Sequence, residues 1–147
     1  MDFQFSREQL SVRDMVREFA LKEIATIAEE IDRTERFPEE TFQKMGEIGL
    51  LGIPFPEEYG GSGGDTISYI LAVEEIGKVC GSTGLSYAAA VSLGASPLYY
   101  FGTEEQKQKY LVPLAKGETL GAVGLTEPHA GSDAGGTRTT ATLDEDY

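Results

Sequence analysis

The residues best suited to chemistry lie in one stretch, residues 121–133, which reads Gly-Ala-Val-Gly-Leu-Thr-Glu-Pro-His-Ala-Gly-Ser-Asp. The stretch turns at Pro128 and passes through Gly131 and Ser132 before two further glycines. Glycine lets backbone N–H groups approach a pyrophosphate closely, and hydroxyl side chains add directed donors. A strand end can also offer donors and acceptors to the edge of a flavin ring. The pattern favours an anion-binding or cofactor-binding loop, with an ordinary polar β-turn as the alternative.

Two side chains in this stretch are candidates for acid–base chemistry, Glu127 and His129. Glu127 lies within the turn, which favours a structural or supporting role over that of a general base. His129 is the only histidine and lies beside a proline, so we expect it to be exposed and inert. The only cysteine, Cys80, rules out an internal disulfide and a cysteine-based zinc site, and we expect it to be a small buried hydrophobe. No catalytic residue and no metal site are assigned.

A helix rich in small residues is predicted over residues 82–101. Alanines, serines and a glycine between residues 86 and 96 let other groups approach its backbone closely. Pro97 must kink or interrupt this helix. Composition alone permits either close helix–helix packing or the wall of a pocket.

Further helices are marked by caps and apolar spacing. Ser6 with Gln9, and Thr103 with Gln106, each have the spacing of a capping box, and Asp65 is a third helix cap. The first helix is predicted to run for about seven turns. A second opens at Pro38 and stops at Gly49, and the last runs from Glu104 to about Gly117. The positions predicted to be buried are Val12, Val16, Phe19, Ile24, Ile27 and Ile31 in the first helix, Phe42, Met45 and Ile48 in the second, and Ile67, Ile70, Leu71, Val73 and Ile76 after Asp65.

The apolar period changes after residue 117. Residues 119–125 and 138–143 are predicted to be two strands, and a turn is predicted to begin at Asp144-Glu145-Asp146. Two strands do not form a stable sheet by themselves. The predicted fold is therefore mainly α, with the strands either packed on the helices or opening a second, β-rich domain that is cut short.

Composition and charge narrow the class of function. The 147 residues carry 12 Lys and Arg against 25 Asp and Glu, a formal net charge of −13. Such a field repels nucleic acid and anionic membranes, so we expect neither as a partner. We see no basic, apolar leader in residues 1–6 and no apolar run of the ~20 residues that a membrane span needs, so a cytoplasmic protein is expected.

Four segments together resemble the acyl-CoA dehydrogenase family. Leu-Thr-Glu-Pro at residues 125–128, followed by Ala-Gly-Ser-Asp at 130–133, is similar to the family's flavin-binding signature. Residues 50–61, 92–94 and 101–107 resemble further family segments in the same order and spacing. The resemblance covers essentially the whole chain. It implies a helical N-terminal domain over residues 1–117, followed at 118–147 by the first strands of an incomplete, β-barrel-like middle domain.

The resemblance also implies roles for individual residues. Those matching family positions at FAD are Val123, Leu125, Thr126, Gly131 and Ser132, with the first three at the isoalloxazine ring and the last two near the pyrophosphate. Val123 departs from the family, in which an aromatic residue is common at that position. Residues matching the family's substrate contacts are Ser86, Ala89, Ala90 and Leu93 along the acyl tail, and Ser132 near the pantetheine arm.

The implied reaction is oxidation of a fatty acyl-CoA thioester to trans-2-enoyl-CoA, by removal of an α-proton and transfer of hydride to FAD. The carboxylate base of the family lies in a C-terminal domain that this sequence lacks, so we expect the chain alone to be inactive and to bind FAD weakly or not at all. The family also implies an electron-transfer flavoprotein as electron acceptor and a homotetramer in the complete enzyme.

Two alternatives remain open at this stage. One is another flavoenzyme, either an acyl-CoA oxidase or a dehydrogenase for branched or aromatic thioesters. The other is a non-catalytic helical binding module that keeps the fold as a natural short protein. Acyl length cannot be read from the loop motifs, because tail choice depends on pocket shape.

Overall fold

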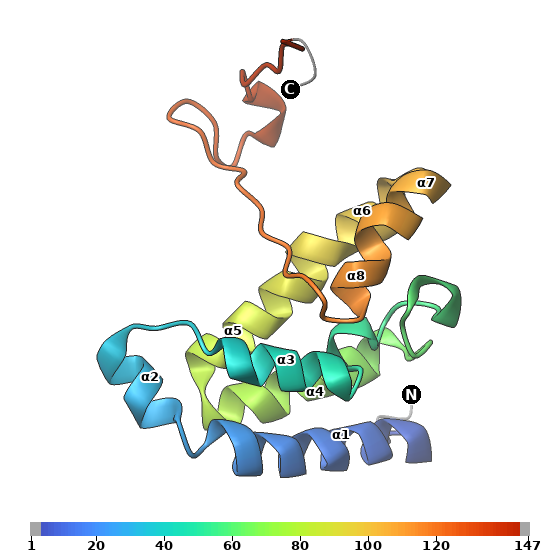
Figure 1. Cartoon of the computed structure of the whole chain (residues 1–147), viewed down its shortest axis with the longest axis vertical. Helices are drawn as coiled ribbons and strands as arrows, with labels where there is room; N and C mark the ends of the chain where they lie inside the picture. The colour runs from blue at the N-terminus through green and yellow to red at the C-terminus, as the bar shows by residue number, and fades with distance from the viewer. Residues whose placement is uncertain (1–3, 145–147) are drawn as a thin grey trace.

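The computed structural model describes residues 4–144, which form a body of packed helices followed by an extended C-terminal segment (Figure 1). Its α-helices are α1 (Arg7–Phe19), α2 (Ala28–Thr34), α3 (Glu39–Glu47), α4 (Thr66–Val79), α5 (Gly81–Ala89), α6 (Ser96–Phe101), α7 (Glu104–Gln106) and α8 (Val112–Ala115). The π-helical segments are η1 (Ala20–Ile24), η4 (Ala90–Ala95) and η5 (Lys107–Leu111). Short 3-10 turns are η2 (Leu50–Gly52), η3 (Glu57–Tyr59) and η6 (Ala134–Gly136).

The predicted helix caps are confirmed. Gln9 N donates to Ser6 Oγ at 3.1 Å, and Ser6 N donates to Gln9 Oε1 at 2.9 Å, which completes the capping box of α1. Asp65 Oδ1 accepts from Ser68 N at 2.7 Å at the start of α4. Gln9 Nε2 also donates to Asp65 Oδ2 at 2.6 Å, so the first turns of α1 and α4 are joined by one side chain.

The first helix is not continuous, contrary to the prediction of about seven turns. Backbone bonding widens at η1, where Ala25 N donates to Ala20 O, and then tightens where Ile27 N donates to Ile24 O. Thr26 Oγ1 donates to Glu23 O and competes with the helical pattern, as hydroxyl side chains inside helices commonly do. The chain bends here and continues as α2, which leaves α1 at a clear angle (Figure 1). The bend keeps Ile24 and Ile31 in the core on either side of it.

The second predicted helix is α3, and its boundaries agree with the sequence. Phe42 and Met45 are buried, and Gly49 adopts a φ of 75°, a left-handed conformation that ends the helix. Ile48 was predicted to be buried, but it is exposed. It lies at the helix end and lines the gap between α1 and α3 instead of the core.

Helix α4 packs chiefly against α1 and α5. Leu71 and Ile76 are buried and Val73 is partly buried, as predicted, but Ile67 and Ile70 are exposed. Both isoleucines lie on the side of α4 that no neighbouring helix covers among the described residues, so the prediction that they are buried is wrong for this chain.

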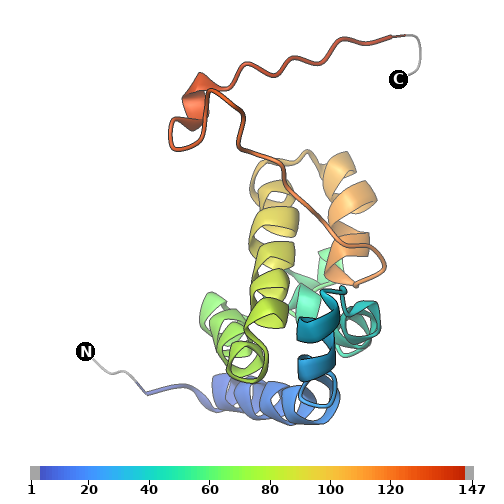
Figure 2. The ribbon, with the colours of Figure 1, turned by 90° about the vertical axis from the view of Figure 1, so that its left-hand side faces the viewer.

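The small-residue helix forms one long run made of α5, η4 and α6, which lies beside an antiparallel run made of α7, η5 and α8 (Figure 2). The predicted interruption near Pro97 takes the form of a π-helix. Ser96 N donates to Val91 O, five residues back, and Ser96 Oγ donates to the same carbonyl at 2.9 Å. Pro97 has no N–H and its ring crowds the carbonyl of the preceding turn, which explains the widening. The segment η5 likewise ends two residues before Pro113.

The core of the helical body is continuous and well satisfied. Tyr87 is fully buried, and its hydroxyl donates to Leu50 O at 2.9 Å. No buried side-chain nitrogen or oxygen among the described residues lacks a hydrogen-bond partner. The buried apolar side chains at the centre include Val16, Ile24, Met45, Leu50, Phe55, Ile76, Tyr87, Val91 and Leu111.

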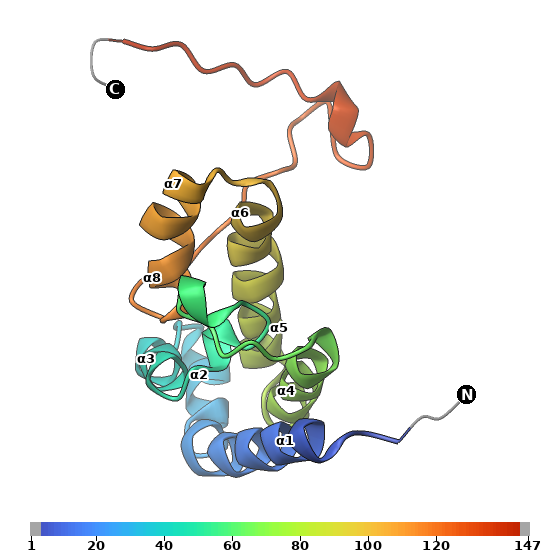
Figure 3. The same ribbon diagram turned by 90° about the vertical axis from the view of Figure 1, so that its right-hand side faces the viewer.

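The two predicted strands are not formed in the part of the chain that the structure describes. Residues 119–125 and 138–143 are extended but pair with no neighbour, and the described segment holds a single isolated bridge, Glu127 with Ala130. Beyond its crossing of the helices, the segment projects away from the body (Figure 3). A strand needs a partner, and the helical body presents only helix surfaces to this segment. The turn predicted to begin at Asp144 extends into residues 145–147, outside the described range.

Candidate functional site

A cavity of about 280 Å³ lies where the C-terminal segment crosses the small-residue helix. The four residues assigned to the acyl tail, Ser86, Ala89, Ala90 and Leu93, all line it. Val123, assigned to the isoalloxazine ring, lines it too. The structure therefore brings these five positions from two separate segments to one place. The other lining residues are Phe37, Phe42, Leu120, Gly121 and Ala122.

Two glycines make the crossing possible. A Cβ atom built on Gly121 would lie 2.9 Å from Gly94 Cα, and one built on Gly94 would lie 3.0 Å from Gly121 Cα. Both contacts are with backbone, which cannot rotate out of the way. The small-residue helix thus packs closely at Gly94 against the extended C-terminal segment, not against another helix, and it walls a cavity immediately beside that contact.

An aromatic pair forms part of the cavity wall. The rings of Phe37 and Phe42 lie 4.8 Å apart between centroids. Phe42 is 3% exposed, whereas Phe37 is 43% exposed. Sequence reasoning placed Phe42 in the core without linking it to the site, and it did not single out Phe37. In the sequence, Phe37 directly precedes Pro38 and Phe42 follows it by four residues, but this spacing does not indicate what either ring contacts.

The lining is chemically simple. Its ten residues are apolar except for the Ser86 hydroxyl, and none carries a charge. Apolar lining with one polar group suits a hydrocarbon chain, because a charged group would lose its hydration without gaining a partner.

The other assigned flavin positions do not line the cavity: Leu125 directly precedes the loop of residues 126–139, and Thr126, Gly131 and Ser132 lie within it. A Cβ atom on Gly131 would lie 3.8 Å from Thr126 Cγ2, so these two positions are neighbours. Leu125, Thr126 and Ser132 are exposed.

Glu127 is held by three donors. Its Oε2 accepts from Arg138 N at 2.8 Å, and its Oε1 accepts from Thr139 N at 2.9 Å and also from the Thr139 hydroxyl. The hydroxyl and then the backbone N–H groups lower the pKa of this carboxyl below its usual value. A general base works best with a pKa near the working pH, so this environment agrees with the predicted structural role.

The positions of His129 and Cys80 agree with the predicted exposure of the first and the predicted burial of the second. His129 is exposed. Cys80 is buried between α4 and α5, with its Sγ 3.1 Å from the donating Thr83 hydroxyl. No group of three or more potential metal ligands occurs within residues 4–144. No helix in that range is both long enough and apolar enough to cross a membrane.

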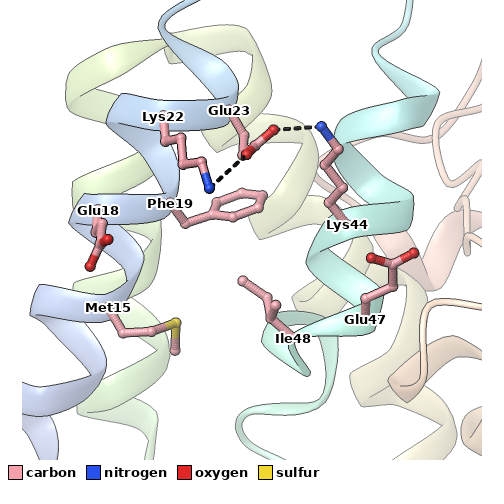
Figure 4. Close-up of a pocket in the computed structure, with 8 residues that line it drawn as sticks. All are labelled: Met15, Glu18, Phe19, Lys22, Glu23, Lys44, Glu47 and Ile48. Carbon is pink, nitrogen blue, oxygen red and sulfur yellow. Dashed lines mark hydrogen bonds and ion pairs between the residues drawn. The ribbon is translucent and has the colours of Figure 1, made fainter.

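A second, more open groove of about 550 Å³ lies between α1 with η1 and α3 (Figure 4). Met15, Phe19 and Ile48 form its apolar part. At one end Glu23 bridges two lysines, Lys22 at 3.8 Å and Lys44 through a short hydrogen bond. None of the positions assigned to FAD or substrate lines this groove.

Comparisons with known proteins agree with the geometry. The family pattern described as "Acyl-CoA dehydrogenase, N-terminal domain" matches residues 6–118. A probable acyl-CoA dehydrogenase of Bacillus subtilis, YngJ, is 74% identical over 96% of this chain, and the match covers 37% of YngJ. The chain thus spans little more than a third of the length of this relative.

Solved structures share the fold as well as the sequence. One comes from work on the electron transferring flavoprotein of Acidaminococcus fermentans and the mechanism of flavin-based electron bifurcation. It has a TM-score of 0.93 and 54% sequence identity, and the match covers 99% of this chain and 38% of that one. An acyl-CoA dehydrogenase of Bacillus anthracis, solved in complex with FAD, has a TM-score of 0.84 and 40% identity, over 97% of this chain and 24% of that one. The chain belongs to the acyl-CoA dehydrogenase family and corresponds to its helical N-terminal domain.

Proposed function

We propose that this chain is the N-terminal part of a flavoprotein that oxidises acyl-CoA thioesters to trans-2-enoyl-CoA by α-proton removal and hydride transfer to FAD. The observation that carries the proposal is the cavity at the crossing, where the assigned tail positions of α5 and η4 meet Val123 of the C-terminal segment. A tail-binding wall and a flavin-contacting residue must be adjacent if a substrate carbon is to reach the flavin. Family membership supports the same reaction class.

Each part of the site has a distinct task in this proposal. Ser86, Ala89, Ala90 and Leu93 hold the acyl tail and exclude water from it. Val123, Leu125 and Thr126 would contact the isoalloxazine ring, while Gly131 and Ser132 would hold the pyrophosphate, with Ser132 also near the pantetheine arm. When bound, FAD supplies the hydride acceptor. The exposed, glycine-containing loop fits such a group, since Gly131 leaves its backbone open to close approach.

The α-proton is removed by a carboxylate that lies outside this chain. Glu127 lies in the motif, but its oxygens are occupied by backbone N–H groups and a hydroxyl. We therefore propose that residues from 118 onward open a second domain, that further domains complete the site, and that the chain alone neither turns over substrate nor binds FAD tightly. An electron-transfer flavoprotein as acceptor and a homotetrameric enzyme belong to the same proposal.

The full-length polypeptide provides the test. Purified protein should carry a flavin absorbance band that bleaches when an acyl-CoA is added without oxygen, and Ser132→Ala should weaken FAD binding. Ser62→Ala, an exposed serine in another loop, serves as the matched control and should change nothing. A full-length protein without flavin absorbance, or one whose flavin stays oxidised with every acyl-CoA tried, contradicts the proposal. Comparing oxygen with an electron-transfer flavoprotein as acceptor separates an oxidase from a dehydrogenase.

A further inference from the structure

The 126–139 loop has little support from the helical body. Within residues 118–144, Ala130 is the one buried residue, and most others are exposed. The shape of the loop must therefore come from its own hydrogen bonds, because packing against neighbours contributes little here.

Most of these internal bonds are local. Glu127 N donates to Ala130 O at 2.8 Å and Ala130 N donates to Glu127 O at 3.2 Å, which forms the tight turn at residues 128 and 129. Gly136 N donates to Asp133 O at 3.0 Å, which forms a second tight turn. Each bond spans three residues, so each fixes its own turn but neither fixes one turn relative to the other.

The Glu127 carboxylate makes the bonds of longer range. It accepts from the backbone of Arg138 and Thr139, which follow it by eleven and twelve residues. Two consecutive N–H groups donate to the two oxygens separately, so a single carboxylate holds both backbone donors. Closing the loop in this way restricts every residue inside it, because its two ends can no longer move independently.

We propose that Glu127 is the positioning residue of this loop, closing it at Arg138 and Thr139 and so holding the cofactor contacts in place. Thr126 directly precedes Glu127, and Gly131 and Ser132 lie inside the closed segment. Thr126 and Gly131 are neighbours because they flank the local turn between Glu127 and Ala130, and the closure fixes that turn relative to residues 138 and 139. The inference rests on the proposed function for the identity of the ligand, but the closure itself does not.

The first arm of the test examines the closure alone, by amide hydrogen exchange in the full-length protein without added FAD. The N–H groups of Arg138 and Thr139 should be protected in the unsubstituted protein and exchange at least tenfold faster in Glu127→Ala, since the charge-assisted acceptor is lost. Glu118→Ala is the matched control, because Glu118 is an exposed glutamate of the same segment with no side-chain hydrogen bond or ion pair in the described structure. Equal exchange in all three proteins overturns the inference.

The second arm measures the affinity for FAD, the shape of the flavin absorbance spectrum and the reduction potential of the bound flavin. Glu127→Ala should weaken FAD binding roughly tenfold or more, and Glu127→Gln should be intermediate because its amide keeps one acceptor oxygen. Glu127→Asp, which keeps both oxygens on a shorter side chain, should restore part of the loss. The helical body should melt at the same temperature in all variants, which separates positioning from general destabilisation.

The outcomes distinguish the positioning role of Glu127 from the proposed function of the whole protein. If Glu127→Ala frees the amides but leaves FAD affinity and the flavin spectrum unchanged, the positioning role is wrong while the proposed function stands. If the unsubstituted full-length protein binds no FAD, the proposed function fails, whatever the amides show.

Discussion

Gly94 and Gly121 meet backbone to backbone, with no room for a Cβ atom between the π-helix and the segment that crosses it. Gly121→Ala should therefore displace the crossing segment and open the cavity. Where the helical body shifts to relieve the clash, the unfolding free energy should fall by about 1–3 kcal/mol. Urea denaturation of the chain, together with limited proteolysis after residue 117, measures both effects. Gly124→Ala is the matched control, because no atom lies within 4 Å of a Cβ built there. Equal proteolysis of the two variants would show that the crossing is loose.

Under the proposed function, the part of the cavity that this chain forms predicts a preference for short acyl chains. Ligand pockets commonly measure about 300–1,000 Å³, and this one is slightly smaller, at about 280 Å³. The aromatic pair at Phe37 and Phe42 closes part of it. In the full-length enzyme, Phe42→Leu should shift the ratio of kcat/KM for longer over shorter acyl-CoA substrates upward by roughly tenfold.

The control for this experiment is Phe101→Leu, the same change at a side chain that is 87% exposed and remote from the cavity lining. It should leave the chain-length ratio unaltered. A Phe42→Leu enzyme whose ratio matches that of the unsubstituted protein would mean that the tail ends elsewhere.

The pair of Arg17 and Glu75 predicts a loss of stability in acid. Two guanidinium nitrogens of Arg17 donate to the two oxygens of Glu75 at 2.9 and 3.0 Å, and Lys78 adds a third bond at 2.9 Å. Glu75 is only 3% exposed. The hydrogen bonds from Arg17 lower the pKa of Glu75 from 4.5 to about 2. A depressed carboxyl pKa stabilises the fold fully above the unfolded value near 4.5, and this contribution is lost as the pH falls through the folded value near 2.

Glu75→Gln should accordingly lower the unfolding free energy by about 1–2 kcal/mol at neutral pH and flatten its decline between those two pH values, since Arg17 is half-exposed and can rehydrate. Glu74→Gln removes the neighbouring carboxylate, which pairs with Lys78 at 2.7 Å in a more exposed position. It should change the stability by less than about 0.5 kcal/mol. Similar effects from both substitutions would show that burial of Glu75 is unimportant.

The capping box at the start of α1 predicts a cost for a single hydroxyl. Ser6→Ala removes the acceptor for Gln9 N. It also loosens the Gln9 side chain, which donates to Asp65 at the start of α4. The expected loss is about 1 kcal/mol of unfolding free energy. Ser11→Ala, an exposed change within the same helix, should be neutral or slightly stabilising, because alanine is the better helix former. Thermal unfolding of the two variants in parallel checks the difference.

Sequence reasoning succeeded where the determinants are local. The caps at Ser6, Asp65 and Thr103 depend on residues three positions apart, and all three form. The interruption near Pro97 follows from the missing N–H of that residue alone. A helix face that meets other helices can be read from spacing, so Val16, Met45 and Ile76 were correctly placed in the core.

It failed where the outcome depends on distant partners. The bend at residues 25–27 satisfies the packing of two separate helices, which local spacing does not reveal. The two strands have the right composition but no partner within residues 4–144. The tail positions could be named through the family resemblance, whereas the aromatic wall at Phe37 became visible only when the fold brought it to the small-residue helix.

The π-helix η4 allows the wall of this cavity to tolerate the loss of one residue. Such a segment holds one residue more than an α-helix of equal span, so a single-codon deletion within residues 90–95 can be absorbed by a return to α-helical winding. The residues beyond the deletion would keep their orientation relative to those before it, whereas a deletion in an ordinary α-helix turns everything beyond it by about 100°. Lineages can thus reshape the wall at Leu93 by loss or gain of one amino acid while α6 and its aromatic side chains keep their orientation.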